Sequence, residues 1–387
     1  MNKTDIKRTS ILNSANKVFS EKGFFQTTIS EIAKGAGIAD SAVYRYFKGK
    51  EEILFAIPEE QMNLYLSNLD DQTEGIKGAE NKLRKLIWYH CKFFTTHRAY
   101  THVLLLECRS NTRFYGSKAY ELIRKYSQII IRIIEEGIQE GRISDSVSPR
   151  LLRDMIMGTI DHAALDWIFK NAPSPLEQAE NISELILNSA RSNIGHGNEL
   201  DSKAKKRKRI IEAATRIFAE KGYEGATISE IAKEAEVADG TIYDYYESKE
   251  NLIVNIPEEN LKELFHYIDE TSPEKKLERM ILFCFRFLNN NRHFTSILVL
   301  MLRSNRKFYK SESDKILGKI RDRIGDIIVE GIKQSVFLRD IDIPTFHHLM
   351  FGTIDHIIIP WVIFKRKYSL LEVGEEASKL FVDAIRA

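Results

Sequence analysis

Residues 28–47 have the sequence TISEIAKGAGIADSAVYRYF, and residues 227–246 repeat its pattern as TISEIAKEAEVADGTIYDYY. In the first stretch Thr28 precedes Glu31 by three residues, a spacing that predicts a capping box at the start of a helix. Glycines then predict a turn, after which Asp40 is expected to cap a second short helix. Two short helices joined by a tight turn are typical of a helix-turn-helix, the second helix of which enters the major groove of DNA.

Sequence similarity between two halves extends along the whole chain. Residues 23–34 and 222–233 are identical at eight of twelve positions, at an offset of 199. Residues 158–162 and 352–356 both have the sequence GTIDH, at an offset of 194, because the second copy is five residues shorter in between. A period near 195 is too long for a solenoid repeat and indicates a duplicated, fused subunit. Residues 193–202, rich in Gly, Asn and Ser, are expected to form the linker.

The hydrophobic pattern outside this motif is helical. Apolar residues at 11, 12, 15, 18 and 19 follow the spacing of an amphipathic helix. The chain has eight prolines and no convincing hairpin signal, so we expect an all-α fold. Helices are predicted over Ile6–Phe19, Thr28–Lys34, Asp40–Phe47, Lys50–Leu69, Lys82–Phe94, Arg98–Cys108, Arg113–Gly141, Pro149–Phe169 and Leu176–Ser192. Pro58, and Pro257 in the second copy, predict a kink or break in the long helix.

The composition is that of an ordinary globular chain. Of 387 residues, 43% are hydrophobic, and 57 Lys and Arg nearly balance 55 Asp and Glu, for a net charge of +2. A nucleic-acid site must therefore be local. Three widely spaced cysteines predict buried reduced thiols, with no disulfide framework and no metal pair. The sequence offers no secretory signal and no apolar stretch near the roughly 18 residues of a membrane span, so a cytoplasmic location is expected.

The TISEIAK segment, the Val/Ile-Tyr-x-Tyr segment and the following Lys-Glu resemble the DNA-binding domain of the TetR family of bacterial transcriptional repressors. The resemblance implies a small DNA-binding domain followed by a larger helical ligand-binding and dimerisation domain. Because that family normally forms homodimers, the duplicated chain is expected to be a covalent pseudo-dimer, with further self-association left open. The expected boundaries are helix-turn-helix domains at 1–48 and 203–247, helical domains at 49–192 and 248–387, and the linker at 193–202.

The same resemblance implies which residues meet DNA. Residues in the first copy that would hold phosphates or face base edges are Thr28, Ser41, Ala42, Tyr44, Arg45, Tyr46 and Lys50. Their equivalents in the second copy are Thr227, Gly240, Thr241, Tyr243, Asp244, Tyr245 and Lys249. For both recognition tyrosines, packing against the long helix is an alternative role that is compatible with DNA contact.

The two DNA-binding motifs differ in charge. Residues 1–55 carry nine basic and six acidic side chains, whereas residues 201–254 carry ten and eleven. Six of those ten lie in residues 203–209, a basic arm that either attracts phosphates or is a solvated charge run. Glu236 replaces Gly37 in the turn, which questions the turn geometry if a positive φ is needed. We therefore expect the first motif to bind DNA more strongly.

The helical halves contain a second set of paired residues, for which a small-molecule pocket and a helical bundle are alternative uses. Its members are Arg109, Asn111, Phe114, Asp161, His162, Trp167, Arg303, Asn305, Phe308, Asp355, His356 and Trp361. Arg109 and Arg303 could meet an anionic headgroup or bridge helices. The arrangement is similar to fatty-acid-metabolism branches of the TetR family, whose effector is an acyl-CoA. Gly158 and Gly352, in apolar helical runs, predict close helix packing.

An enzyme is not expected. Adjacent Asp and His side chains on a helix point about 100° apart and make no acid–base dyad, and no nucleophile triad, zinc motif or phosphate loop accompanies them. No cofactor, resident metal or membrane partner is expected either. The sequence predicts an effector-responsive repressor that binds a double-stranded DNA operator and a small molecule of unidentified structure. The alternative is an interaction protein with one functional and one degenerate DNA-reading head.

Overall fold

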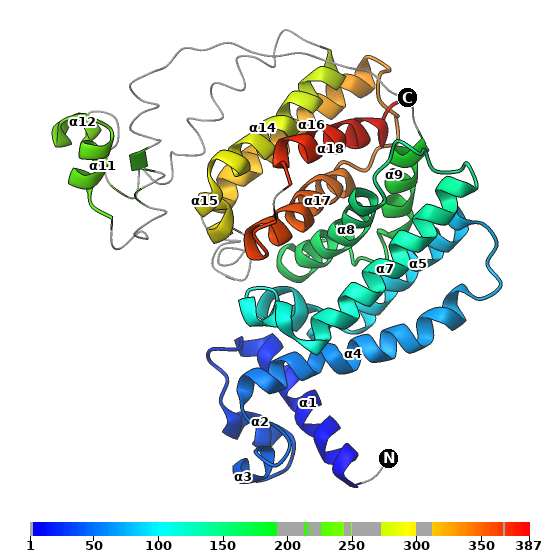
Figure 1. Ribbon diagram of the computed structural model, residues 1–387, viewed down its shortest axis with the longest axis vertical. Coiled ribbons are helices and arrows are strands. Elements are labelled where there is room, and N and C mark those ends of the chain that lie inside the picture. Colours follow the sequence, from blue (N-terminus) through cyan, green and yellow to red (C-terminus); the bar gives the residue numbers. More distant parts are fainter. Residues whose placement is uncertain are drawn as a thin grey trace. The chain divides into compact units, whose positions relative to one another are not determined.

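The computed structural model describes residues 3–191, 213, 214, 217, 226–243, 249, 272–298, 312–366 and 368–387 (Figure 1). The chain divides into two compact units. The first contains residues 1–191 together with Pro344–Ile357, and the second contains most of the remainder of the second copy. The two units are described separately below.

The first unit is helical throughout its described part (Figure 1). Its elements are α1 (Lys3–Lys22), α2 (Ile29–Gly35), α3 (Asp40–Val43), α4 (Lys50–Thr73), α5 (Ala79–Thr96), α6 (Arg98–His102), the π-helical turn η1 (Val103–Cys108), the 3₁₀ turn η2 (Thr112–Gly116), α7 (Lys118–Gln139), α8 (Pro149–Lys170) and α9 (Ala179–Arg191). Helices α1–α3 form a small amino-terminal domain. Helix α4 leaves this domain and packs along α5 and α7.

The described part of the second unit contains the corresponding helices of the second copy. They are α11 (Ile228–Glu234), α12 (Asp239–Tyr243), α14 (Pro273–Asn290), α15 (Arg292–Ile297), α16 (Glu312–Lys333), the end of α17 (Ile343–Ile363), and α18 (Leu370–Asp383). Helix α14 packs against α16 and α18. Within the described residues the only extended pairing is one isolated antiparallel bridge, between Phe337 and Arg386. The prediction of an all-α tandem fold is confirmed.

Two local predictions at the second short helix are wrong. Asp40 lies in the first turn of α3, and the residue before it, Ala39, is the N-cap without a side-chain hydrogen bond. The helix ends at Val43, and the chain continues to Phe47 in tight turns. The capping box at Thr28 is present, because the Thr28 hydroxyl accepts from the Glu31 backbone and the Glu31 carboxylate accepts from the Thr28 N–H.

Helix α4 runs through Pro58 without a break, so of the two predicted alternatives a break is wrong and a kink stays a prediction. Pro257 lies outside the described residues. Proline has no N–H, so the carbonyl of Leu54 loses its usual helical donor. The buried thiol of Cys108 donates to this carbonyl, with the sulfur 3.8 Å from the oxygen. A residue of η1 therefore satisfies the backbone group that the proline releases.

The three cysteines, Cys91, Cys108 and Cys284, are free and buried, as their spacing predicts. Among the described residues, no helix combines the length and the apolar character needed to cross a bilayer. The described part of the chain also brings together no group of three or more His, Cys, Asp or Glu side chains that could hold a metal ion.

Candidate functional site

The turn between α2 and α3 has the hydrogen bonds of a Schellman motif. The Gly37 N–H donates to Lys34 and the Ile38 N–H donates to Ala33. Gly37 has a φ of +69°, the left-handed conformation that this motif requires. Buried Ile32, Ala33 and Val43 hold the two helices together.

The second copy makes the same turn without the glycine. Glu236 occupies the position of Gly37 with a φ of +54°, and its N–H donates to Lys233. The turn therefore needs a positive φ in both copies, and Glu236 adopts it in place of glycine. A non-glycine residue pays about 1–2 kcal/mol for this conformation. The second helix-turn-helix is therefore built with backbone strain that the first lacks.

The surface of the first helix-turn-helix exposes several of the residues predicted to contact DNA. Tyr44 is 59% exposed. Thr28, Ser41 and Arg45 are also exposed, whereas Ala42, Tyr46 and Lys50 are half-buried. Because α3 ends at Val43, Arg45 and Tyr46 lie in the turns after the helix. This exposure leaves Tyr44 free for the predicted contact with DNA and does not require the alternative role, packing against the long helix.

In the second copy, Tyr243 is 55% exposed at the end of α12. Thr227 and Gly240 are exposed as well. Thr241 belongs to α12, but its side chain is not described. Asp244, Tyr245, the linker at 193–202 and the basic arm at 203–209 lie outside the described residues.

Lys50 and Lys249 have an architectural role besides the predicted contact with phosphate. The Lys50 Nζ donates to the Thr27 carbonyl at 2.8 Å and lies 4.4 Å from the centre of the Phe24 ring. The Lys249 Nζ donates to the equivalent carbonyl, that of Ala226, at 3.0 Å. Lys50 therefore ties the start of α4 to the loop before α2, and Lys249 makes the matching contact with the residue before Thr227.

Helices α8 and α17 touch backbone to backbone within the first unit. A Cβ atom on Gly158 would lie 2.2 Å from the carbonyl oxygen of Gly352, and a Cβ on Gly352 would lie 2.0 Å from that of Gly158. Even alanine would clash at either position, so only glycine permits this approach. The close packing predicted for the two glycines is present.

The two GTIDH segments exchange partners at this contact. The His356 Nε2 donates to the Asp161 carboxylate at 2.6 Å, and His162 bonds Asp355 in the same manner. Arg109 adds an ion pair to Asp161. Burial alone would raise the pKa of Asp161, but Arg109 and His356 together hold it well below its usual range. Each aspartate therefore pairs with the histidine of the other copy and not with its sequence neighbour.

The remaining predicted ligand residues have other partners. Asn111 donates to the Glu51 carboxylate on α4 at 3.0 Å, and buried Phe114 packs 5.7 Å from the Phe55 ring, centre to centre. Trp167 and Trp361 each stack under an arginine, with Arg98 and Arg292 at 4.4 and 4.1 Å from the ring centres. Arg303, Asn305 and Phe308 lie outside the described residues.

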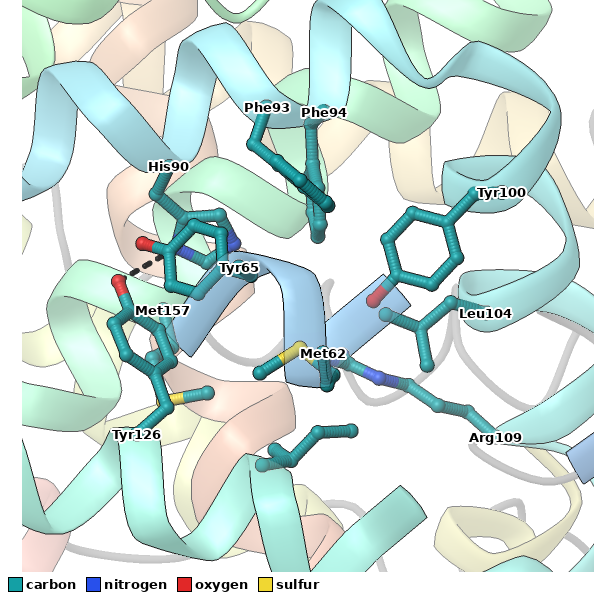
Figure 2. A pocket seen from close by; sticks show the side chains of 11 residues that line it. Met62, Tyr65, His90, Phe93, Phe94, Tyr100, Leu104, Arg109, Tyr126 and Met157 are labelled. Carbon is teal, nitrogen blue, oxygen red and sulfur yellow. Dashed lines mark hydrogen bonds between the residues drawn. The ribbon is translucent and has the colours of Figure 1, made fainter. Parts of the chain in front are cut away.

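A narrow cavity lies inside the helical half of the first copy (Figure 2). Its volume is about 20 Å³, room for about one water molecule. Eleven side chains from α4, α5, α6, η1, α7 and α8 line it: Met62, Tyr65, His90, Phe93, Phe94, Tyr100, Leu104, Arg109, Ile123, Tyr126 and Met157. A molecule larger than water must displace side chains on entry, and methionine is the side chain that adapts most easily.

The polar groups of the cavity are buried among aromatic rings. The Tyr126 hydroxyl and the His90 Nδ1 are 3.0 Å apart. Burial lowers the pKa of His90 to about 4, so the imidazole is neutral near pH 7. The Tyr100 hydroxyl points into the cavity and has no hydrogen-bond partner, although Tyr100 is only 1% exposed (Figure 2).

Of the predicted ligand residues that the structure describes, Arg109 is the one that lines this cavity. Sequence reasoning missed Tyr65, His90, Tyr100 and Tyr126. The available signal was their position in the apolar stripe of a helix, where a phenol or imidazole needs a polar partner. Which neighbouring helix supplies that partner is not encoded in the periodicity.

Two family profiles match the chain, and each matches it twice. The profile described as bacterial regulatory proteins of the tetR family matches residues 11–57 and 210–256. The profile described as the C-terminal region of YsiA-like proteins matches residues 58–189 and 249–384. Together the four matches cover both copies.

Individual relatives correspond to about one copy. The fatty acid metabolism regulator protein of Bacillus subtilis is 32% identical over 182 residues, 47% of this chain and 94% of that protein. YhgD of the same organism, an uncharacterised HTH-type transcriptional regulator, is 42% identical over 180 residues, 46% of this chain and 92% of that protein. The solved structure of the regulator FadR from B. subtilis in complex with stearoyl-CoA is 32% identical and covers 46% of this chain and 97% of its own, with a TM-score of 0.44.

Proposed function

The chain belongs to the TetR family of bacterial regulatory proteins, and on that premise we propose that it is an effector-responsive repressor that acts as a covalent pseudo-dimer. The observation that carries the proposal is the duplication of both family regions in one chain. A DNA-binding regulator follows from the family itself. The relatives reported above are regulators, which supports the expectation that the chain is not an enzyme.

The contact between α8 and α17 supports the pseudo-dimer. The glycine pair brings the two backbones together, and the Asp161–His356 and Asp355–His162 pairs join residues of the two copies reciprocally. A reciprocal contact, in which residue i of one copy meets residue j of the other and j meets i, is the mark of a twofold interface. Here the twofold relation is approximate because the two copies differ in sequence.

The proposed operator has two half-sites, separated by about 34 Å or a multiple of it. Their sequences need not mirror each other, because Arg45 corresponds to Asp244 in the second copy. A carboxylate near DNA is repelled by phosphate unless it accepts from a cytosine amine. The strained turn at Glu236 and the acidic balance of the second motif support a stronger contribution from the first.

The contacts of η1 suggest how a ligand would act on the DNA-binding domain. Leu104, in the first turn of η1, and Arg109, the residue directly after it, line the cavity. Between them, the Glu107 carboxylate accepts from the Phe24 N–H at 3.0 Å, in the loop after α1. A ligand that displaces Leu104 or Arg109 would therefore pull on the DNA-binding domain, and it releases DNA if it binds the displaced state better.

The proposed effector is a hydrophobic or amphipathic molecule such as an acyl-CoA. The lining of the cavity, which is mostly apolar with one arginine, supports this class, as does the similarity to a fatty acid metabolism regulator. Arg109 is already paired with Asp161, so an anionic headgroup would have to share it.

The test is footprinting of the full chain on DNA selected from a random library, with and without stearoyl-CoA. The proposal expects two protected half-sites and release on addition of the ligand. Tyr44→Ala and the matched Tyr243→Ala should each weaken protection, the former more strongly. Protection of a single half-site that is unaffected by Tyr243→Ala would favour the alternative, an interaction protein with one degenerate head.

A further inference from the structure

The first copy's cavity contains a hydroxyl that its own protein does not satisfy. Tyr100 is 1% exposed, and its hydroxyl points into the cavity without a hydrogen-bond partner (Figure 2). Leaving a buried hydroxyl unpaired costs about 1–3 kcal/mol, which phenylalanine at the same position would avoid. A ligand atom that accepts a hydrogen bond from this hydroxyl, or donates one to it, would therefore remove this free-energy cost.

The polar residues that line this cavity can be compared with the residues at the corresponding positions of the second copy. The alignment of the copies is fixed here by shared contacts: the Thr101 hydroxyl donates to the Phe94 carbonyl at 3.0 Å, and the Thr295 hydroxyl to the Leu288 carbonyl at 2.8 Å. Lys82 pairs with Glu136, as Lys276 pairs with Glu330. The offset of 194 therefore holds for α5 and α14 and for α7 and α16.

Every hydrogen-bonding aromatic or imidazole group of the cavity is lost in the second copy. At the offset of 199 that relates IPEE at 57–60 to IPEE at 256–259, Tyr65 corresponds to Leu264. At the offset of 194, His90, Tyr100 and Tyr126 correspond to Cys284, Phe294 and Ile320. The described members of the second set, Cys284 and Ile320, are buried.

The other lining positions keep their character. The six apolar residues remain apolar: Met62, Phe93, Phe94, Leu104, Ile123 and Met157 correspond to Leu261, Phe287, Leu288, Leu298, Leu317 and Phe351. Arg109 corresponds to Arg303. The divergence removes all four of the uncharged polar side chains and keeps the arginine and the apolar character of the other six positions. This pattern indicates a difference in ligand chemistry between the copies and not general drift.

We propose that the first copy alone selects a ligand whose apolar body carries a hydroxyl or carbonyl oxygen, which Tyr100 and the Tyr126–His90 pair recognise. The inference rests on the proposed function, because it assigns the effector class of the same helical half. The neutral imidazole and the phenols can each donate or accept, so both hydroxyl and carbonyl oxygens fit. Each chain then has one oxygen-selective site, and the equivalent positions of the second copy offer no such discrimination.

The test uses the full chain and a matched set of probes, stearic acid and the positional isomers of monohydroxystearic acid, with binding measured by calorimetry. One neutral hydrogen bond contributes about 0.5–1.5 kcal/mol, so at least one isomer should bind about 2- to 13-fold more tightly than stearic acid. The tighter event should have a stoichiometry of one per chain. Equal affinities across the whole set, or preference at two sites per chain, would overturn the inference.

Variants locate the discrimination. Tyr100→Phe introduces the residue of the second copy and should remove the preference while leaving the affinity for stearic acid within about twofold, since only a hydrogen bond is lost. Tyr89→Phe makes the same chemical change, also to the residue of the second copy (Phe283), on the same helix as His90 but outside the cavity lining. This control should keep the preference. A preference that survives Tyr100→Phe and Tyr126→Phe would overturn the assignment.

Footprinting separates this inference from the proposed function. Equal binding of all the acids, with two protected half-sites and release of DNA, would leave the repressor proposal standing and remove the oxygen selectivity. Binding by none of the acids, and no effect of stearoyl-CoA on protection, would remove the effector class and the inference with it.

Discussion

Gly158 and Gly352 lie so close that a Cβ on either residue would fall 2.2 Å or less from the carbonyl oxygen of the other. The separation is set by backbone atoms, which cannot rotate away as a side chain can. The approach also brings Asp161 and Asp355 within reach of His356 and His162. Glycine is therefore required at this crossing for both packing and polar pairing.

Gly158→Ala should destabilise the first unit by about 1–3 kcal/mol, because the two helices must separate to admit the methyl group. Helix propensity alone would predict the opposite sign, a gain of up to about 1 kcal/mol. Gly318→Ala in α16 is the matched control, since its nearest neighbour is the flexible Arg321 guanidinium at 3.7 Å. Urea titration of both variants checks the prediction, and equal stabilisation by both would contradict it.

Asp161→Asn should cost about 3–5 kcal/mol, because the side chain of Asp161 is only 4% exposed and its loss of charge leaves the Arg109 guanidinium, 18% exposed, without its counter-charge. The control is Glu60→Gln, which breaks the Arg8–Glu60 pair, whose side chains are 40% and 34% exposed. Surface pairs of this kind contribute at most about 1 kcal/mol. Chemical denaturation at neutral pH measures the free energy of unfolding of both variants. Similar losses of stability would contradict the prediction that the Asp161 pair contributes more than an exposed pair.

The pH dependence of stability should report the burial of His90. Its pKa is about 4 in the folded chain and 6.5 as the reference value, so below pH 6.5 the unfolded chain binds a proton that the folded chain does not. Stability is therefore lost as the pH falls, by up to about 3 kcal/mol between these two values. His90→Cys, the residue of the second copy, removes this contribution. The free energy of unfolding of wild type minus that of the variant should fall on acidification, and a constant difference would refute the assignment.

Glu236→Gly should stabilise the second helix-turn-helix by about 1 kcal/mol, because glycine adopts the φ of +54° without strain. The reciprocal change, Gly37→Ala, should destabilise the first motif by a similar amount. No atom lies within 4 Å of a Cβ at Gly37, so its cost is conformational and not steric. Thermal unfolding monitored by circular dichroism measures both, and changes of the same sign would count against the argument.

Glu107→Met should uncouple the effector from DNA. The substitution introduces the residue of the second copy and removes the acceptor for the Phe24 N–H. A hydrogen bond to a charged group contributes about 1.5–3 kcal/mol. The factor by which saturating stearoyl-CoA lowers the affinity for DNA should therefore be about tenfold or more smaller in the variant. The affinity for stearoyl-CoA itself, measured by calorimetry, should change little. A loss of ligand affinity with unchanged coupling would place Glu107 in the ligand site instead.

The fold was predictable because its signals are local. The capping box at Thr28 and the glycine turn depend on residues a few positions apart, and the duplication appears directly in the letters. The unbroken α4 was not predictable, since the donor that compensates Pro58 is the thiol of Cys108, 50 positions further along. A local rule for proline cannot include a distant hydrogen bond.

The functional groups were predictable only in part. Arg109 and the Asp-His segments were identified as a set, but their adjacency in sequence concealed that each aspartate bonds the histidine of the other copy. The cavity tyrosines were missed because a buried phenol and a buried phenylalanine follow the same periodicity. The site residues assigned to DNA and to ligand remain predictions for the experiments above.

The reciprocal Asp–His exchange has an evolutionary consequence. A chain truncated after residue 191 would retain Asp161 and His162 but lose both His356 and Asp355. Because both copies contain GTIDH, a lone copy could regain these pairs only by associating with a second molecule of itself. In the fused chain the two partners of the exchange are always present together, so the copies can diverge in what they recognise while the contact between them is kept.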